Sequence, residues 1–155
     1  MRVWRLCRKP HAEEPLSGKG GTVAAGRWHE KGSRIVYTAA TLSLAALELL
    51  VHVGVDHAPA DLVAIEIEIP NALEISEFPA RSLPRDWRDV PASRRLQQLG
   101  TKWLDGRKSA VLRVPSAVIP AESNFLLNPL HSDASRIAVV GIMSFEMDTR
   151  LVRKK

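Results

Sequence analysis

Glu48 is a charged residue inside an otherwise mainly apolar segment, an unusual position for a carboxylate. Glu48 lies among leucine, alanine and valine residues in the segment "LSLAALELLVH". A carboxylate that faces a protein core costs on the order of several kcal/mol unless a partner or a task compensates for it. Two interpretations are open. Glu48 lies at the edge of a helix with its carboxylate in water, or it lines a low-dielectric cleft as a functional group.

Two further side chains could work with that carboxylate. Arg27 lies in "AGRWHEKG", between a glycine-containing loop and a predicted strand. Its guanidinium suits bidentate binding of phosphate, and the alternative is an ordinary surface arginine. Tyr37 is the single tyrosine of the chain, at the end of that strand. The alternative for Tyr37 is core packing with its hydroxyl at the surface.

Motifs of several other enzyme classes are missing from the sequence. No Gly-x-Ser-x-Gly elbow for a nucleophilic serine is present, and "GKGGTVAAG" lacks the ending of a phosphate-binding P-loop. The five histidines follow no zinc-binding pattern. The sequence therefore predicts no metal site.

Length and composition favour an ordinary globular protein. With 155 residues, 45% hydrophobic and 25% charged, the chain is predicted to form one domain over residues 1–155. The single cysteine, Cys7, excludes an internal disulfide. The first residues do not resemble a signal peptide, and no apolar run is long enough to span a bilayer. We therefore expect a cytoplasmic protein without membrane contact.

The net charge of +5 and the pI of about 9.8 suggest an anionic partner. That partner is a nucleic acid, a phosphate-rich small molecule or an acidic protein. The arginines are scattered, and no basic helix of helix-turn-helix type is present. We therefore expect no direct nucleic-acid binding, with a basic nucleic-acid-binding module kept as an alternative. The terminal "RLVRKK" is predicted to be a solvated tail.

The order of predicted elements indicates an α+β fold with mixed or antiparallel sheets. Helices are predicted over 41–54 and 93–106, with Thr41 and Ser93 as N-caps and Gly54 as a terminator. Strands are predicted over 3–8, 33–38, 62–69, 109–116 and 136–147, the last as a strand or a hairpin. Strands outnumber helices and do not alternate regularly with them, which argues against a doubly wound sheet.

Some segments carry more detailed expectations. In "LVAIEIEI" the alternation predicts a half-buried antiparallel strand with Ala64, Glu66 and Glu68 on its outer face. Pro115 is predicted to stop its strand. Segments 78–95 and 117–135 are rich in proline and polar residues, and we expect them to be irregular.

Six segments, taken in order, resemble the RES domain family, the toxins of bacterial toxin–antitoxin pairs. They are "VWRLCR", "GRWHEKGSRIVYTA", "LSLAALELLVH", "LQQLGTKWL", "LRVPSAVIPAESNFLLNPLH" and "FEMDTRL". The resemblance covers nearly the whole chain. Ala25 and His29 stand where the family commonly has glycine and asparagine. Both changes leave Arg27 intact.

The resemblance implies a fold like that of ADP-ribosyltransferase toxins, and the consumption of NAD. It implies that Glu48, Arg27 and Tyr37 are catalytic, and that Arg5, Arg27, Tyr37 and Ser116 bind NAD. NAD is then a substrate, and no cofactor is expected. Nicotinamide leaves from a pyridinium without needing a proton, so one carboxylate can suffice where most glycosidases use two.

The resemblance leaves the acceptor of the ADP-ribosyl group open. Water gives an NAD glycohydrolase, inorganic phosphate gives a phosphorylase, and a protein side chain gives an ADP-ribosyltransferase. The implied partners are an Xre-like antitoxin and a second copy of the chain within a toxin–antitoxin complex. A catalytically inactive partner-binding domain is a further alternative, although the presence of Arg27, Tyr37 and Glu48 argues against it.

Overall fold

Seven strands and two longer helices make up the computed structural model, which describes residues 1–151. Residues 152–155, most of the predicted basic tail, lie outside the described residues. The strands are β1 (Arg2–Arg8), β2 (Val36–Ala39), β3 (Leu62–Glu68), β4 (Ile75–Glu77), β5 (Val111–Pro115), β6 (Ser123–Leu127) and β7 (Ala138–Phe145). The helices are α1 (Gly20–Val23), α2 (Leu42–Val53) and α3 (Arg94–Gly106), with short 3₁₀ turns at Lys9–His11, Ala80–Ser82 and Ser132–Arg136. No helix among residues 1–151 combines the length and apolar character needed to cross a membrane.

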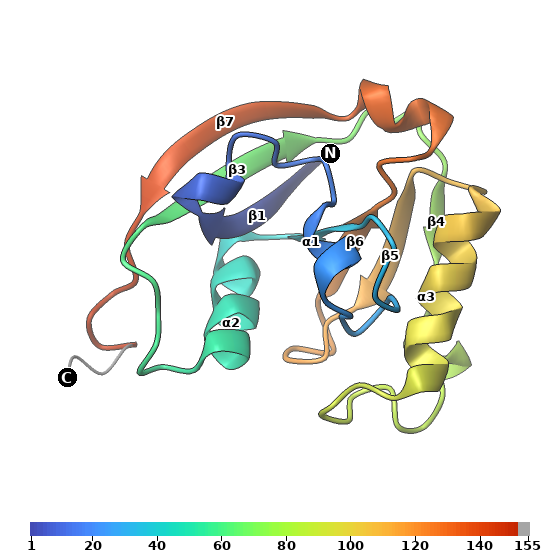
Figure 1. The fold of residues 1–155 in the computed structure, drawn as a ribbon, viewed down its shortest axis with the longest axis horizontal. Helices are drawn as coiled ribbons and strands as arrows, with labels where there is room; N and C mark the ends of the chain where they lie inside the picture. The colour runs from blue at the N-terminus through green and yellow to red at the C-terminus, as the bar shows by residue number, and fades with distance from the viewer. Residues whose placement is uncertain (152–155) are drawn as a thin grey trace.

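The strands form one sheet in the order β4-β5-β6-β2-β1-β3-β7 (Figure 1). Only β4 and β5 run parallel among the described strands, and the other neighbours are antiparallel. This mixed sheet with few helices confirms the predicted α+β class.

The sheet is weakly joined between β1 and β2. These strands pair at a single position, Trp4 opposite Ala39, whereas β1 pairs with β3 along its full length. The sheet therefore consists of two halves, β7-β3-β1 and β2-β6-β5-β4, that diverge next to this position. Arg5 and Tyr37 lie beside the point of divergence.

Helix α2 packs across the two halves at their junction. It begins where predicted, because the Thr41 hydroxyl accepts a hydrogen bond from the Leu44 N–H at 3.1 Å. It ends at Gly54, which adopts a φ of 81°. Its buried Leu44 and Ala45 pack with Ala39 of β2 and with Trp4 and Leu6 of β1. This packing holds the middle of α2 over the sheet.

Helix α3 covers the other half of the same sheet face. Its buried residues pack in one cluster with Leu112 of β5 and Leu126 of β6, and the strand register places these two residues opposite each other. Figure 1 shows α2 and α3 standing apart, with β5 and β6 between them. Ser93 occupies the predicted N-cap of α3, but its hydroxyl makes no capping hydrogen bond.

Three expectations about strands need correction. Segment 117–135 is not irregular throughout, since it contains β6, a central strand paired with β2 and β5. The three-residue strand β4 follows β3 and was not predicted. Ala64 is fully buried, whereas Glu66 and Glu68 are partly exposed as expected. Ala64 is covered because β3 is flanked by β1 and β7, which place Leu6 and Met143 beside it. Segment 136–147 forms one strand and not a hairpin.

Candidate active site

Glu48 lies on α2 with its carboxylate turned to a neighbouring loop and strand. Its Oε1 atom accepts a hydrogen bond from the Ser116 hydroxyl at 2.8 Å and one from the Asn124 Nδ2 at 2.6 Å. The side chain is half-buried. These contacts favour the interpretation of Glu48 as a functional group over that of a fully solvated glutamate at the helix edge. A carboxylate with both contacts on one oxygen keeps its second oxygen free for another group.

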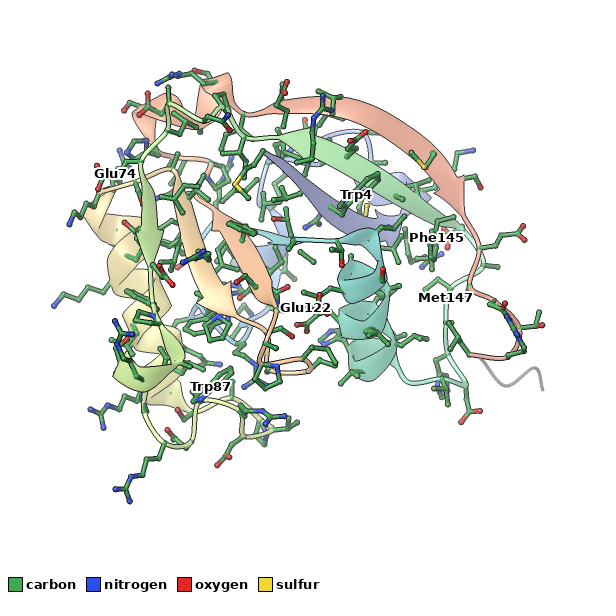
Figure 2. The ribbon with its side chains drawn as sticks, turned by 180° about the vertical axis from the view of Figure 1, so that it is seen from behind. Trp4, Glu74, Trp87, Glu122, Phe145 and Met147 are labelled. Atoms are coloured by element: carbon green, nitrogen blue, oxygen red, sulfur yellow. The ribbon has the colours of Figure 1, made fainter. Side chains whose placement is uncertain are left out.

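The Ser116 hydroxyl is oriented by the turn that follows β5. Ser116 is 0% exposed, and its Oγ accepts hydrogen bonds from the Val118 and Ile119 N–H groups at 3.1 and 2.9 Å. With both lone pairs used, the hydroxyl proton points to Glu48. The Ser116 N–H donates to the Glu122 carbonyl at 2.9 Å, and Figure 2 shows Glu122 between α2 and the ends of β5 and β6.

Tyr37 fastens the turn that carries Arg27. Its Oη accepts a hydrogen bond from the Trp28 N–H at 3.1 Å and lies 2.8 Å from His29 Nδ1. The other ring nitrogen of His29 is 3.0 Å from the Ala24 carbonyl, which can only accept. The proton of neutral His29 is therefore assigned to Nε2, and the Tyr37 hydroxyl donates to Nδ1.

The turn is so tight that glycine is needed next to Arg27. A Cβ atom on Gly26 would lie 2.7 Å from the Tyr37 hydroxyl and 2.7 Å from the His29 ring. The Gly26 N–H bonds to the His29 carbonyl at 3.1 Å, which closes the turn.

Burial lowers the pKa of His29 and raises the pKa of Tyr37 far above its usual range. Both side chains are therefore neutral at pH 7.

Arg27 reaches a loop that is distant in sequence. Its Nη1 donates hydrogen bonds to the Trp87 carbonyl at 2.7 Å and to the Asp89 carbonyl at 3.1 Å. Arg88 in the same loop donates from Nε to the Ala117 carbonyl at 3.1 Å. This connection joins the Arg27 turn to the residues that follow Ser116. Trp87 is labelled in Figure 2 below the ends of the strands.

Arg5 is a cation at the divergence of β1 and β2. Its Nη1 lies 3.4 Å from the Tyr37 carbonyl oxygen, and its Nε is buried without a hydrogen-bond partner within residues 1–151. A half-buried guanidinium that is this poorly satisfied is suited to an anionic ligand. Arg5 also contacts the neighbouring Cys7, although burial dominates there and raises the pKa of that thiol.

Strands β2 and β6 connect the residues around Glu48 with the residues around Tyr37. Ala39 pairs with Asn124, and Tyr37 pairs with Leu126, so Tyr37 and Asn124 lie diagonally on one face of the sheet. Such diagonal neighbours are about 7–8 Å apart, within reach of long side chains. The structure thus places Glu48 with Ser116 and Asn124, and Arg5 and Arg27 with Tyr37. The paired strands β2 and β6 connect these two groups.

Asn124 is the contact that sequence reasoning missed. It lies in segment 117–135, which the sequence predicted to be irregular, and the sequence assigned it no role. Its contact with Glu48 depends on the pairing of β6 with β2, and the sequence around it has no clear strand pattern. Recognition of "SNFLL" as a central strand would have placed it beside Tyr37.

Two surface pockets lie outside these groups. One includes Phe78, Arg113 and Glu122 near the ends of β4 and β5, and the other includes Arg8 and His57. Within residues 1–151, no group of three histidine, cysteine, aspartate or glutamate side chains could hold a metal ion.

The family model described as the RES domain matches residues 2–150. This chain belongs to the RES family. It is similar to the protein named Toxin Res from Photorhabdus laumondii, with 39% identity over all of this chain and 99% of that protein. It is 36% identical to the Prs ADP-ribosylating toxin of a Sphingobium strain, over 97% of this chain and 96% of that protein.

Comparison of structures supports the same fold. The chain superposes on a chain in the crystal structure of the M. tuberculosis MbcT–MbcA toxin–antitoxin complex with a TM-score of 0.73. The match covers 93% of this RES chain and 83% of the other, at 14% identity. The family predicted from the sequence motifs and the fold expected from it are therefore confirmed.

Proposed function

We propose that this RES protein is the toxin of a toxin–antitoxin pair and that it breaks the nicotinamide–ribose bond of NAD. The relatives named Toxin Res support the toxin role. The relative named as ADP-ribosylating supports NAD as substrate, because NAD is the donor of ADP-ribose. The observation that carries the proposal is the Glu48 carboxylate, held on one oxygen by Ser116 and Asn124.

The chemistry needs one carboxylate at the reacting ribose. Cleavage builds positive charge on ribose C1′ in an oxocarbenium-like transition state. The electron pair of the C1′–N1 bond moves into the pyridinium ring, so nicotinamide leaves neutral without a proton. Glu48 stabilises the charge at C1′ electrostatically and accepts hydrogen bonds from ribose hydroxyls. Its Oε2, which has no partner within residues 1–151, is the oxygen available for this task.

The remaining residues bind and position NAD. Arg27 and Arg5 hold the pyrophosphate, with the Arg27 Nη1 anchoring the loop around Trp87 at the same time. The Tyr37 ring flanks the nicotinamide, because its hydroxyl is already used by Trp28 and His29. Ser116 was expected to contact NAD directly. Its complete burial favours a different role, that of orienting Glu48.

The decisive experiment is incubation of the purified protein with NAD, with and without inorganic phosphate, followed by mass spectrometry of the products. Free nicotinamide with ADP-ribose identifies water as acceptor, since the water oxygen bonds to C1′ and releases a proton. Nicotinamide with phosphorylated ADP-ribose identifies phosphate. NAD that stays intact under both conditions, and in the presence of candidate protein acceptors, would contradict the proposal.

A protein ADP-ribosyltransferase using the same site is the second candidate. The similarity to the Prs ADP-ribosylating toxin over nearly the whole of both chains favours it. In this reaction a nucleophilic side chain of the target bonds to C1′ and loses its proton. Transfer of label from adenylate-labelled NAD to a protein would support this acceptor, and label found only in small molecules would exclude it.

An antitoxin is the partner that the proposed function requires. The structural neighbour was solved in a toxin–antitoxin complex, and we propose an Xre-like antitoxin that covers the site. The net charge of +5 favours rapid capture of an acidic partner. Expression of the wild-type chain alone at high yield with normal cellular NAD would contradict this proposal.

Self-association is proposed through the edge strand β7. Val140 and Ile142 are exposed on this strand, which ends the sheet, and unpaired edges readily pair with another strand. Antiparallel pairing of two copies about Gly141 would set Arg136 opposite Glu146 and Val140 opposite Ile142. Light scattering should report a dimer that Ile142→Lys converts to a monomer, while Leu130→Lys, at an exposed apolar residue elsewhere, leaves it intact. A monomeric wild-type protein would contradict the proposal.

A further inference from the structure

Asn124 has a buried amide oxygen without a hydrogen-bond partner among residues 1–151, which is energetically unfavourable. It lies on β6 opposite Ala39 of β2 and Val114 of β5. Its Nδ2 donates to Glu48 Oε1 at 2.6 Å, but its Oδ1 is buried and has no hydrogen-bond partner within residues 1–151. A buried acceptor without a partner lowers stability, and native structures contain few of them.

The orientation of this amide follows from the charge of its neighbour. An ionised Glu48 can only accept hydrogen bonds, so the Asn124 Nδ2 must face it. A flipped amide would place Oδ1 against Oε1, which would bring two acceptors together. The hydrogen bond to Glu48 therefore leaves Oδ1 in its unpaired position.

Asn124 and Ser116 reach the carboxylate from different parts of the sheet. Ser116 follows β5, and Asn124 belongs to β6, yet both donate to Oε1 at 2.8 and 2.6 Å. Two donors on one oxygen fix the rotation of the carboxylate about its last side-chain bond. They also direct Oε2 away from the two strands, as the oxygen left for a ligand.

We propose that Asn124 is a positioning residue that holds the Glu48 carboxylate in its reactive orientation, at the expense of its own unpaired Oδ1. The inference rests on the proposed function, because the orientation matters only if Glu48 acts on NAD. A purely structural asparagine would be expected to have both ends of its amide paired. Asn124 does not meet that expectation.

Asn128 is the matched control for stability. Asn128 is fully buried, whereas Asn124 is partly exposed with a buried Oδ1. The Asn128 Nδ2 donates to the Leu104 carbonyl at 2.8 Å and its Oδ1 accepts from the Leu130 N–H at 3.1 Å. Asn128→Leu leaves two backbone groups unpaired and should lower Tm by about 5 °C or more. Asn124→Leu removes one hydrogen bond and one unpaired acceptor together, and should change Tm by less than about 2 °C. A Tm loss for Asn124→Leu as large as that for Asn128→Leu would overturn the proposal.

Kinetics separate a positioning role from a binding role. Asn124→Leu should lower kcat for NAD by about tenfold to a hundredfold, because small misplacements of catalytic groups have effects of this size. KM should stay within about twofold of the wild-type value. In a Glu48→Gln background, Asn124→Leu should cause no further loss, since the two residues act as one unit.

The outcomes distinguish this proposal from the proposed function. A wild-type protein that leaves NAD intact defeats the proposed function and with it the positioning role of Asn124, whatever the melting temperatures show. An active wild-type protein whose kcat is unchanged by Asn124→Leu defeats the positioning role alone. Losses that multiply in the Asn124→Leu, Glu48→Gln double variant also overturn it, because they assign the two residues independent roles.

Discussion

Ser116 and Glu48 are 68 residues apart in the chain, yet the Ser116 hydroxyl lies 2.8 Å from the Glu48 carboxylate. The turn after β5 directs this contact, because two backbone N–H groups occupy the lone pairs of Ser116 Oγ. The Ser116 hydroxyl therefore donates its hydrogen bond to the carboxylate in a direction that is fixed before any ligand binds. This arrangement gives the glutamate in the apolar run a defined orientation.

Ser116→Ala should reduce both stability and turnover. The change leaves the Val118 and Ile119 N–H groups without their acceptor, which should lower the free energy of unfolding by about 2 kcal/mol or more. Loss of one donor to Glu48 should lower NAD turnover by about tenfold. Denaturant unfolding and NAD-consumption rates measure the two effects.

Ser82→Ala is the control for that experiment. Its hydroxyl is exposed and bonds to the Pro79 carbonyl, so the change should alter stability by less than about 0.5 kcal/mol. If Ser116→Ala were as stable as Ser82→Ala, the hydroxyl of Ser116 would not organise the turn.

Arg27→Ala should release the loop around Trp87 as well as weaken NAD binding. The change removes two hydrogen bonds to backbone carbonyls of that loop, so trypsin should cleave faster after the exposed Arg85 and Arg88. NAD affinity should fall by about tenfold or more, the effect expected when one charge-assisted contact is lost. Arg34→Ala, at an exposed arginine nearby, should alter neither quantity. Unchanged cleavage in Arg27→Ala would show that Arg27 does not hold the loop.

Acidification should destabilise the protein through His29. Burial lowers the pKa of His29 from its ordinary value of 6.5, so the unfolded chain takes up a proton at a higher pH than the folded chain does. The stability from neutral His29 is complete above pH 6.5 and is lost as the pH falls toward the lowered pKa. The slope contributed by this one group is at most about 1.4 kcal/mol per pH unit.

Denaturant unfolding between pH 7 and pH 5 tests this dependence on His29. His29→Asn places a polar side chain that does not titrate at this position, and should flatten the fall in unfolding free energy with acidification. Equal slopes for wild type and His29→Asn would assign the acid sensitivity to other groups.

The sequence predicted most of the elements that position the site, for identifiable reasons. Helix α2 was predictable because Thr41 and Gly54 mark its ends, and β5 because Pro115 stops it. Strand β6 was missed because its residues show no clear alternation, and its identity depends on pairing with both β2 and β5. Pairing between distant segments is a tertiary property that local pattern does not encode.

The residues of the site were predictable in part. Arg27, Tyr37 and Glu48 stood out by type and surroundings, whereas the role of Asn124 depends on β6. The sequence also did not predict the burial of Ser116 or the hydrogen bonds from Arg27 to the loop around Trp87. Both depend on contacts between residues that are far apart in the chain.

Turnover of NAD by Glu48→Gln, measured with thermal melts of the same protein, tests whether the Glu48 carboxylate is needed for the reaction. Because Ser116 and Asn124 both donate to one oxygen, glutamine can keep that oxygen in place, and Tm should stay within about 2 °C of wild type. NAD turnover should fall by about a hundredfold or more, while NAD affinity changes little. Glu74→Gln, at an exposed glutamate, should retain full turnover. A folded Glu48→Gln protein that consumes NAD at the wild-type rate would remove Glu48 from the mechanism.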